Sequence, residues 1–270
     1  MSTVIGILIG LVLLFAAVFQ QGGVAVFFNL HAVMITIGGT LAATFISFPL
    51  PRVTRAFVVM VNVFRSEVEQ PMDYIRQIID LSVKARKQSL LSLEDNVKMI
   101  NNRFLRLGVE MVVDGHSPET IRSVMETEIE FMEERHSSGA NIFRSAGRFA
   151  PAFGLVGTLI GLIAMLRAVA SGGNNAQTIG AGMSVALVAT FYGALLANLF
   201  FYPVAEKLRS RTEDEILLAR VLLDGVLLLQ KGVNPRVIEK KLNAHLPPQF
   251  RRQYYFGQLG KDVQGNAGAS

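Results

Sequence analysis

The sequence predicts an all-α membrane protein with four transmembrane helices, a helical cytoplasmic domain between helices 2 and 3, and a C-terminal cytoplasmic helix. First, 51% of its 270 residues are hydrophobic, which is more than an ordinary soluble domain contains. Second, charge is segregated, because no Asp, Glu, Lys or Arg occurs before Arg52. Third, long apolar stretches recur, and at about 1.5 Å per residue they can cross a hydrocarbon core of roughly 30 Å.

The first two spans lie within residues 1–50. Val4–Phe19 is apolar and carries Gly6 and Gly10 at a GxxxG spacing. It lacks the basic segment of a cleaved signal peptide, so we expect it to remain as a membrane helix. The second span, Ala32–Phe48, is followed by PLPR, and we expect this pair of prolines to end the helix.

Residues 51–146 are expected to form the cytoplasmic helical domain. In PMDYIRQIIDLSVKARK the apolar residues recur every three or four positions, and LSLEDNVKMINNRFLRLGVEMVV repeats this amphipathic pattern. Ser117-Pro118-Glu119 then predicts a new helix, with a serine cap, a proline at the first position and an acid in the first turn. We expect that helix to continue directly into the third span.

Residues 147–204 hold the third and fourth spans, and each has a face of small residues. Glycines recur every three or four residues in the first of these spans, and small or polar residues recur every four in the second. Such faces allow helices to approach closely in lipid, so we assign to helix packing Gly154, Gly157, Gly161, Ala186, Ala194 and Asn198. The oxygens of Thr158, Thr190 and Asn198 could also line an ion path, and both readings stay open.

The chain ends with amphipathic helices and a polar tail. Residues 205–246 continue as cytoplasmic helices, the last of which follows Asn234-Pro235. Residues 247–270 are polar and contain several glycines, so we expect a disordered tail.

Basic residues predict the orientation. Residues 20–30 and 171–177 contain no Lys or Arg, whereas residues 52–148 and 207–261 contain nearly all of them. Because basic residues favour the cytoplasmic side, we expect the middle block and both termini in the cytoplasm.

Composition also argues against several classes of function. The net charge of +5 and the pI near 9.6 come from basic residues interleaved with acids, which does not indicate a nucleic-acid-binding face. The chain has no cysteine, and its four histidines lack a ligand spacing, so we expect no metal site. It also lacks a nucleophile–base pattern and a phosphate loop, so we expect neither an enzyme nor a bound cofactor.

None of the four spans contains an acidic residue. A cation that crosses a membrane needs a group that compensates its charge, usually a carboxylate. In an ion-driven machine that carboxylate would have to come from another chain. The same absence would equally suit a passive scaffold.

Two stretches resemble a known family. APAFGLVGTLIGLIAML and VALVATFYGALLANLFFYPVAEKL resemble the third and fourth transmembrane helices of the MotA/PomA family. These proteins are the A subunits of flagellar motor stators and are more distantly related to TolQ and ExbB. Thr158 in GTLIGL and Thr190 in ATFYG are most similar to the sodium-type PomA and MotP branch, and the resemblance covers most of the chain.

The resemblance implies an ion path beside Thr158 and Thr190, next to a membrane aspartate of a MotB/PomB-type B subunit. The transported cation would be sodium rather than a proton. From the residues alone, the two hydroxyls could instead bond the preceding turn of their own helix. Asn29 stands where several sodium-type members carry an aspartate, which weakens the sodium assignment, and its residue type favours a helix cap.

The resemblance also assigns Pro151 and Pro203 to the coupling of ion flow with a shape change. Proline weakens a helix, so a hinge is reasonable, but each could also lie at a helix end where proline is tolerated.

The cytoplasmic block also contains a charged motif. ARKQSLLSLE resembles the family motif ARKxGxLxLE, which makes Arg86, Lys87 and Glu94 candidate contacts with the rotor switch complex. Without the family, these charges would be read as solvated surface. Gln88-Ser89 stands where glycine is common.

The resemblance therefore implies the A subunit of a stator in the lipid of the bacterial inner membrane. It implies a homo-oligomer, a pentamer, that surrounds a B-subunit dimer. Two alternatives remain: an ExbB/TolQ-like energiser of outer-membrane processes, or a non-conducting membrane scaffold. The first usually has three spans and lacks the ARK…LE motif.

Overall fold

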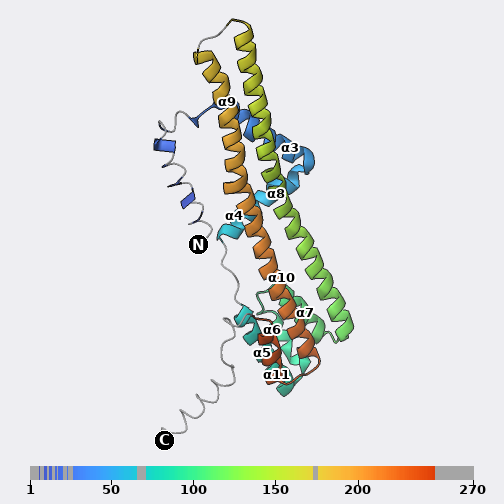
Figure 1. The fold of residues 1–270 in the computed structure, drawn as a ribbon. Helices are drawn as coiled ribbons and strands as arrows, with labels where there is room; N and C mark the ends of the chain where they lie inside the picture. Colours follow the sequence, from blue (N-terminus) through green and yellow to red (C-terminus); the bar gives the residue numbers. More distant parts are fainter. Residues whose placement is uncertain are drawn as a thin grey trace. The chain divides into compact units, whose positions relative to one another are not determined.

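The computed structural model describes residues 6, 9–10, 12–13, 16, 18–20, 23, 27–65, 71–172 and 176–246. Every element within these ranges is a helix, as the sequence predicts (Figure 1). Among the described residues, three helical segments are long and apolar enough to span a membrane: Leu30–Ser47, Pro118–Ala170 and Ile179–Gln230. Much of the predicted first span, and the whole of the predicted tail 247–270, lie outside the described residues.

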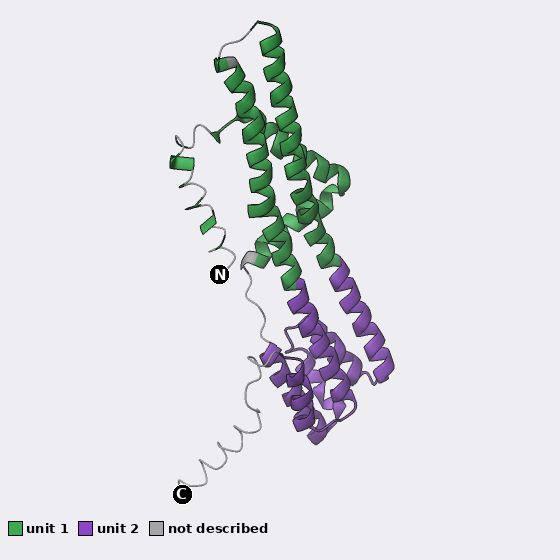
Figure 2. Cartoon of the chain, in the orientation of Figure 1, with its two compact units in different colours: residues 1–66, 135–211 green, residues 67–134, 212–270 purple. Residues whose placement is uncertain are grey.

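The chain forms two compact units, each assembled from segments that are distant in sequence (Figure 2). Unit 1 comprises residues 1–66 and 135–211, and unit 2 comprises residues 67–134 and 212–270.

The second span begins and ends where its residues predict. Asn29 caps α2 (Leu30–Val33), because its side-chain oxygen accepts a hydrogen bond of 3.2 Å from the Ala32 N–H. A π-helical turn, η2 (Met34–Gly38), leads into α3 (Gly39–Ser47). The expected stop at PLPR is confirmed, since α4 (Leu50–Arg65) starts as a separate helix after an extended Phe48.

The expected long helix is also confirmed. α8 (Pro118–Ala170) is one helix of 53 residues that includes the third span. Ser117 caps its start, where its Oγ accepts a hydrogen bond of 3.2 Å from the Thr120 N–H, and Pro118 takes the first position.

The fourth span continues without a break into the last part of the chain. α9 (Ala176–Leu195) is followed by the π-helical segment η4 (Leu196–Phe201) and then by α10 (Tyr202–Gln230). Within unit 1, these helices bury mainly small and β-branched residues against α4 and α8, with few aromatic rings among them.

Unit 2 contains shorter helices around an aliphatic core. These are α5 (Pro71–Gln88), η3 (Leu90–Leu93), α6 (Glu94–Val97), α7 (Arg103–Val113) and α11 (Pro235–Ala244). They pack with the first part of α8 and the last part of α10. The largest buried side chains of this core include Ile75, Ile78, Ile79, Leu105, Ile121, Met125, Leu222 and Leu229.

Candidate functional site

The glycine face of α8 brings its backbone against α9, and the two helices lie side by side in Figure 1. A methyl group placed on Gly161 would lie 2.6 Å from the carbonyl oxygen of Gly182. A methyl group on Gly193 would lie 2.6 Å from the carbonyl oxygen of Ala150. Because real Cβ atoms do not approach so closely, these positions require glycine for the helices to meet.

The other positions assigned to packing divide into two groups. Gly154 and Gly157 face Ala189 of α9, and Ala186 is buried against Gly161. Ala194 and Asn198 are exposed instead, and the Asn198 side-chain N–H₂ donates to the Ala194 carbonyl at 2.9 Å, within its own helix. The structure therefore gathers four of the six positions at the contact between α8 and α9, which we call the seam, and leaves the last two outside it.

The two candidate ion-path threonines lie together at this seam. Thr158 of α8 and Thr190 of α9 form a hydrogen bond of 2.5 Å between their hydroxyls. Thr158 Oγ1 also lies 3.1 Å from the Gly154 carbonyl oxygen, and Thr190 Oγ1 lies 3.2 Å from the Ala186 carbonyl oxygen. Two longer contacts, of 3.4 and 3.5 Å, cross between the helices. We call these four oxygens the threonine cluster.

The threonine cluster combines both readings of these residues. Each hydroxyl oxygen lies within hydrogen-bond distance of the carbonyl one turn earlier in its own helix and of the other hydroxyl. Because each hydroxyl has one proton, the threonine that donates to the other hydroxyl does not donate to its own helix at the same time. Since a hydroxyl carries one proton and two lone pairs, the cluster offers several oxygen lone pairs at one place. Thr190 is exposed and Thr158 is half-buried in the single chain, so the cluster is open to a partner.

The electrostatics of unit 1 leave this cluster without a local negative charge. Residues 1–66 contain no Asp or Glu, and residues 135–211 contain only Glu206. Glu206 lies 3.6 Å from the guanidinium of Arg144, outside the apolar part of the third and fourth spans. A cation at the threonine cluster would therefore need a carboxylate from another chain.

Sequence reasoning missed a second row of threonines, on the second span. Thr36, Thr40 and Thr44 are buried and lie four residues apart. The Thr36 hydroxyl donates to the Ala189 carbonyl at 3.3 Å, which ties this span to α9 next to Thr190. The hydroxyls of Thr40 and Thr44 bond their own helix, to the carbonyls four residues earlier. The four-residue spacing was the signal in the sequence that could have revealed this row.

The two candidate coupling prolines do not lie at free helix ends. Pro151 is inside α8, so the expectation that it could sit at a helix start is wrong. The helix begins much earlier, at the Ser117 cap, and Pro151 only removes the hydrogen bond to the Gly147 carbonyl. Pro203 is the second residue of α10, just after the π-helical segment η4 and inside a continuous helical run. π-Helical turns and prolines are both places where helices bend.

The candidate rotor-contact residues lie at the two ends of the short segment, Ser89 and η3, that joins α5 to α6. Arg86 and Lys87 are exposed in the last turn of α5, and Glu94 is exposed at the start of α6. Ser89, between them, has φ 113° and ψ 165°, a conformation that is essentially restricted to glycine. It is the position where the family motif carries glycine.

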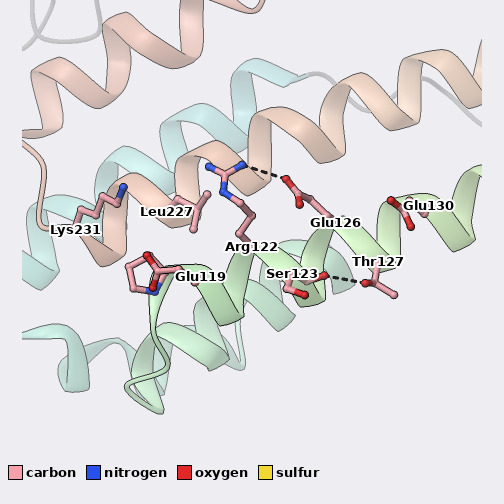
Figure 3. Close-up of a pocket in the computed structure, with 9 residues that line it drawn as sticks. Glu119, Arg122, Ser123, Glu126, Thr127, Glu130, Leu227 and Lys231 are labelled. Atoms are coloured by element: carbon pink, nitrogen blue, oxygen red, sulfur yellow. Dashed lines mark hydrogen bonds and ion pairs between the residues drawn. The ribbon is translucent and has the colours of Figure 1, made fainter.

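Unit 2 also has an open groove of about 360 Å³ beside the start of α8 (Figure 3). Its charged side chains have both signs, and Figure 3 shows Arg122 paired with Glu126, at 3.1 Å. The lining residues are Pro118, Glu119, Arg122, Ser123, Glu126, Thr127, Glu130, Leu227 and Lys231. Within the described part of the chain, no group of three or more His, Asp or Glu side chains is arranged to hold a metal ion.

Comparisons with known proteins decide the family. The profile of the MotA/TolQ/ExbB proton channel family matches residues 96–221. The chemotaxis protein PomA of Vibrio alginolyticus is 35% identical over 246 residues, which covers 91% of this chain and 95% of PomA. The chain belongs to the MotA/PomA family of flagellar stator A subunits.

Two further proteins match over a similar length. The Bacillus subtilis protein YtxD is 40% identical and covers 89% of this chain and 88% of its own length. The structure of the flagellar MotAB stator complex from Bacillus subtilis aligns with a TM-score of 0.83 and 35% identity, over 92% of this chain and 96% of the matched chain. The similarity therefore extends through both units.

Proposed function

We propose that this chain is the A subunit of a flagellar motor stator, which with a B subunit couples cation flow across the bacterial inner membrane to torque on the rotor. The observation that carries the proposal is the threonine cluster, in a unit whose membrane spans contain no acid. The full-length similarity to PomA and to a MotAB complex supports this function over an ExbB/TolQ-like energiser.

The cluster provides neutral oxygens, and the B subunit would supply the charge. A cation that leaves water needs replacement ligands and a counter-charge in the membrane. Thr158 and Thr190 present hydroxyl oxygens to a partner at the seam, and the Gly154 and Ala186 carbonyls lie beside them. The membrane aspartate that the family expects in the B subunit would complete this path.

We assign sodium rather than the proton as the transported cation. Hard cations prefer oxygen ligands, and two hydroxyls with two adjacent carbonyls can provide them. Asn29 adds no charge to the path, because its side chain is a neutral amide, and its oxygen caps α2. The sodium assignment therefore depends on the threonine cluster.

Torque would pass through the exposed charges of unit 2. Arg86, Lys87 and Glu94 lie around one turn and are accessible to a charged rotor protein. Charged contacts of this kind favour fast and repeated association. Pro151 and Pro203 would let α8 and the α9–α10 run bend as the cation binds and leaves.

The assembly would be a pentamer of this chain around a B-subunit dimer, in membrane lipid, with both termini in the cytoplasm. The inner-membrane, multi-pass character follows from the family and from the three spanning segments. The proposed copy number is supported by the resemblance, and the proposed topology is supported by the distribution of basic residues.

The proposal is tested by expressing the chain with its genomic B partner as the only stator in a non-motile cell. We expect tethered cells to rotate. The double variant Arg86→Glu/Glu94→Lys should stop rotation while the complex still reaches the membrane. The control is Arg76→Glu, which changes an exposed charge near the start of α5, and cells with this variant should still rotate. A complex that inserts but never rotates cells would contradict the stator assignment.

A further inference from the structure

The helix α4 has features that the stator function does not explain. It starts three residues after the end of the second span, so its first turn lies close to the point where that span leaves the membrane. Its 16 residues include three arginines and no acid. Its pattern of apolar and polar residues is strongly amphipathic.

One face of α4 is already covered by unit 1. Val53 and Ala56 are buried, and the ring of Phe57 meets that of Phe143 of α8 edge to face, with centroids 5.3 Å apart. These contacts fix the rotation of the helix about its axis. The opposite half of α4 is therefore held outward.

The outward half divides into an apolar sector and a basic sector. Leu50, Val58 and Val61 are 60%, 60% and 44% exposed, and their spacings of eight and three place them on one side. Arg52 and Arg55, three residues apart, are exposed on another. Neither guanidinium has a hydrogen-bond or ion-pair partner among the described residues.

We propose that α4 lies in the membrane interface and binds anionic phospholipid headgroups through Arg52 and Arg55. The apolar sector would enter the boundary of the acyl chains, and the guanidiniums would reach the phosphate oxygens. Arginine binds phosphate through paired N–H groups, and each basic residue near an anionic surface favours binding roughly fivefold.

Charge complementarity favours this partner over another copy of the chain's unit 1. The residues of unit 1 include ten Lys and Arg side chains and a single acid, Glu206, which already lies beside Arg144. A second unit 1 would bring positive charge to Arg52 and Arg55. An anionic bilayer surface neutralises that charge and continues the apolar environment of the adjoining span.

The absence of tryptophan from the chain provides a direct test. The full-length Val61→Trp variant would be reconstituted in vesicles of phosphatidylcholine and phosphatidylglycerol, with bromine on the acyl chains of one lipid at a time. Bromine quenches only tryptophan that it touches, so the two series measure which lipid lies against α4. The chain without the added tryptophan gives the background.

We expect quenching by both lipids, with several-fold stronger apparent binding of phosphatidylglycerol. Arg52→Gln/Arg55→Gln should lower that preference to about one without removing the quenching. The matched control Arg76→Gln/Arg220→Gln makes the same change of charge at exposed residues of unit 2 and should keep the preference. Equal quenching by the two lipids, or a preference that survives in Arg52→Gln/Arg55→Gln, would overturn the proposal. Absence of quenching would show that protein covers α4, and would overturn it too.

Discussion

Units 1 and 2 bury different kinds of residue along the same helix. In unit 2, α8 buries Ile121 and Met125 in an aliphatic core. In unit 1, the same helix buries Gly154 and Gly161 against the backbone of α9. Removal of apolar surface from water stabilises the first arrangement, whereas in lipid the second depends on close backbone approach. The change of packing along one helix indicates a change of solvent.

The charges of the two units differ in the same way. Residues of unit 1 include ten basic side chains and one acid, whereas those of unit 2 include sixteen basic side chains and twenty acids. Basic residues at the edges of membrane spans favour the cytoplasmic side. A nearly balanced surface is typical of a domain in water, and it leaves specific charges such as Arg86 and Glu94 available for a partner.

The largest expected effect comes from the core of unit 2. Ile121→Ala removes a fully buried side chain and should lower the stability of unit 2 by about 2–5 kcal/mol. Hydrogen exchange in lipid nanodiscs should then show faster exchange across residues 71–134 and 212–246. The control Val124→Ala, at a 40% exposed site on the same helix, should have little effect. Equal effects of the two variants would contradict an aliphatic core in unit 2.

A smaller loss is expected at the glycine seam of unit 1. Gly161→Ala places a methyl group 2.6 Å from the Gly182 carbonyl oxygen and should cost about 1–3 kcal/mol as α8 and α9 separate. Thermal unfolding in detergent, followed by circular dichroism, measures this loss. Gly139→Ala is the matched control, because a methyl group there meets nothing within 4 Å. A seam that tolerates Gly161→Ala as well as Gly139→Ala would remove the distinction between the units.

The smallest effect is a gain, at Ser89. Its conformation is one that glycine adopts without strain, so Ser89→Gly should stabilise the turn between α5 and η3 by about 1 kcal/mol, after the entropic cost of glycine. Hydrogen exchange of this turn should slow accordingly. Ser89→Ala retains a Cβ atom and should bring no gain. If alanine stabilises the turn as much as glycine does, backbone strain is not the cause.

Local signals in the sequence predicted much of the fold. The caps at Asn29 and Ser117, the stop at PLPR and the continuous helix into the third span all depend on residues close together in the chain. The glycine spacing likewise indicated which face of α8 meets another helix. Such features can be predicted because the interactions that cause them span only one or two helical turns.

Features that depend on tertiary context were missed. The interior position of Pro151 follows from the continuous helix expected from Ser117 into the third span, but the proline itself does not reveal it. The role of Thr36 depends on Ala189, a residue 153 positions away. The meeting of Thr158 with Thr190 also required the packing of two helices. The sequence supplied the residues of the candidate site, but only the fold brings their oxygens together.

The most direct test of the account is flagellar rotation speed against sodium concentration at fixed pH, with this chain and its B partner as the only stator. We expect the speed to rise and saturate with sodium. Thr158→Val keeps the shape but removes the hydroxyl, and should shift half-saturation to higher sodium, whereas Thr158→Ser should remain close to the original chain. Rotation that is indifferent to sodium but abolished by a protonophore would contradict the sodium path and indicate a proton-driven stator.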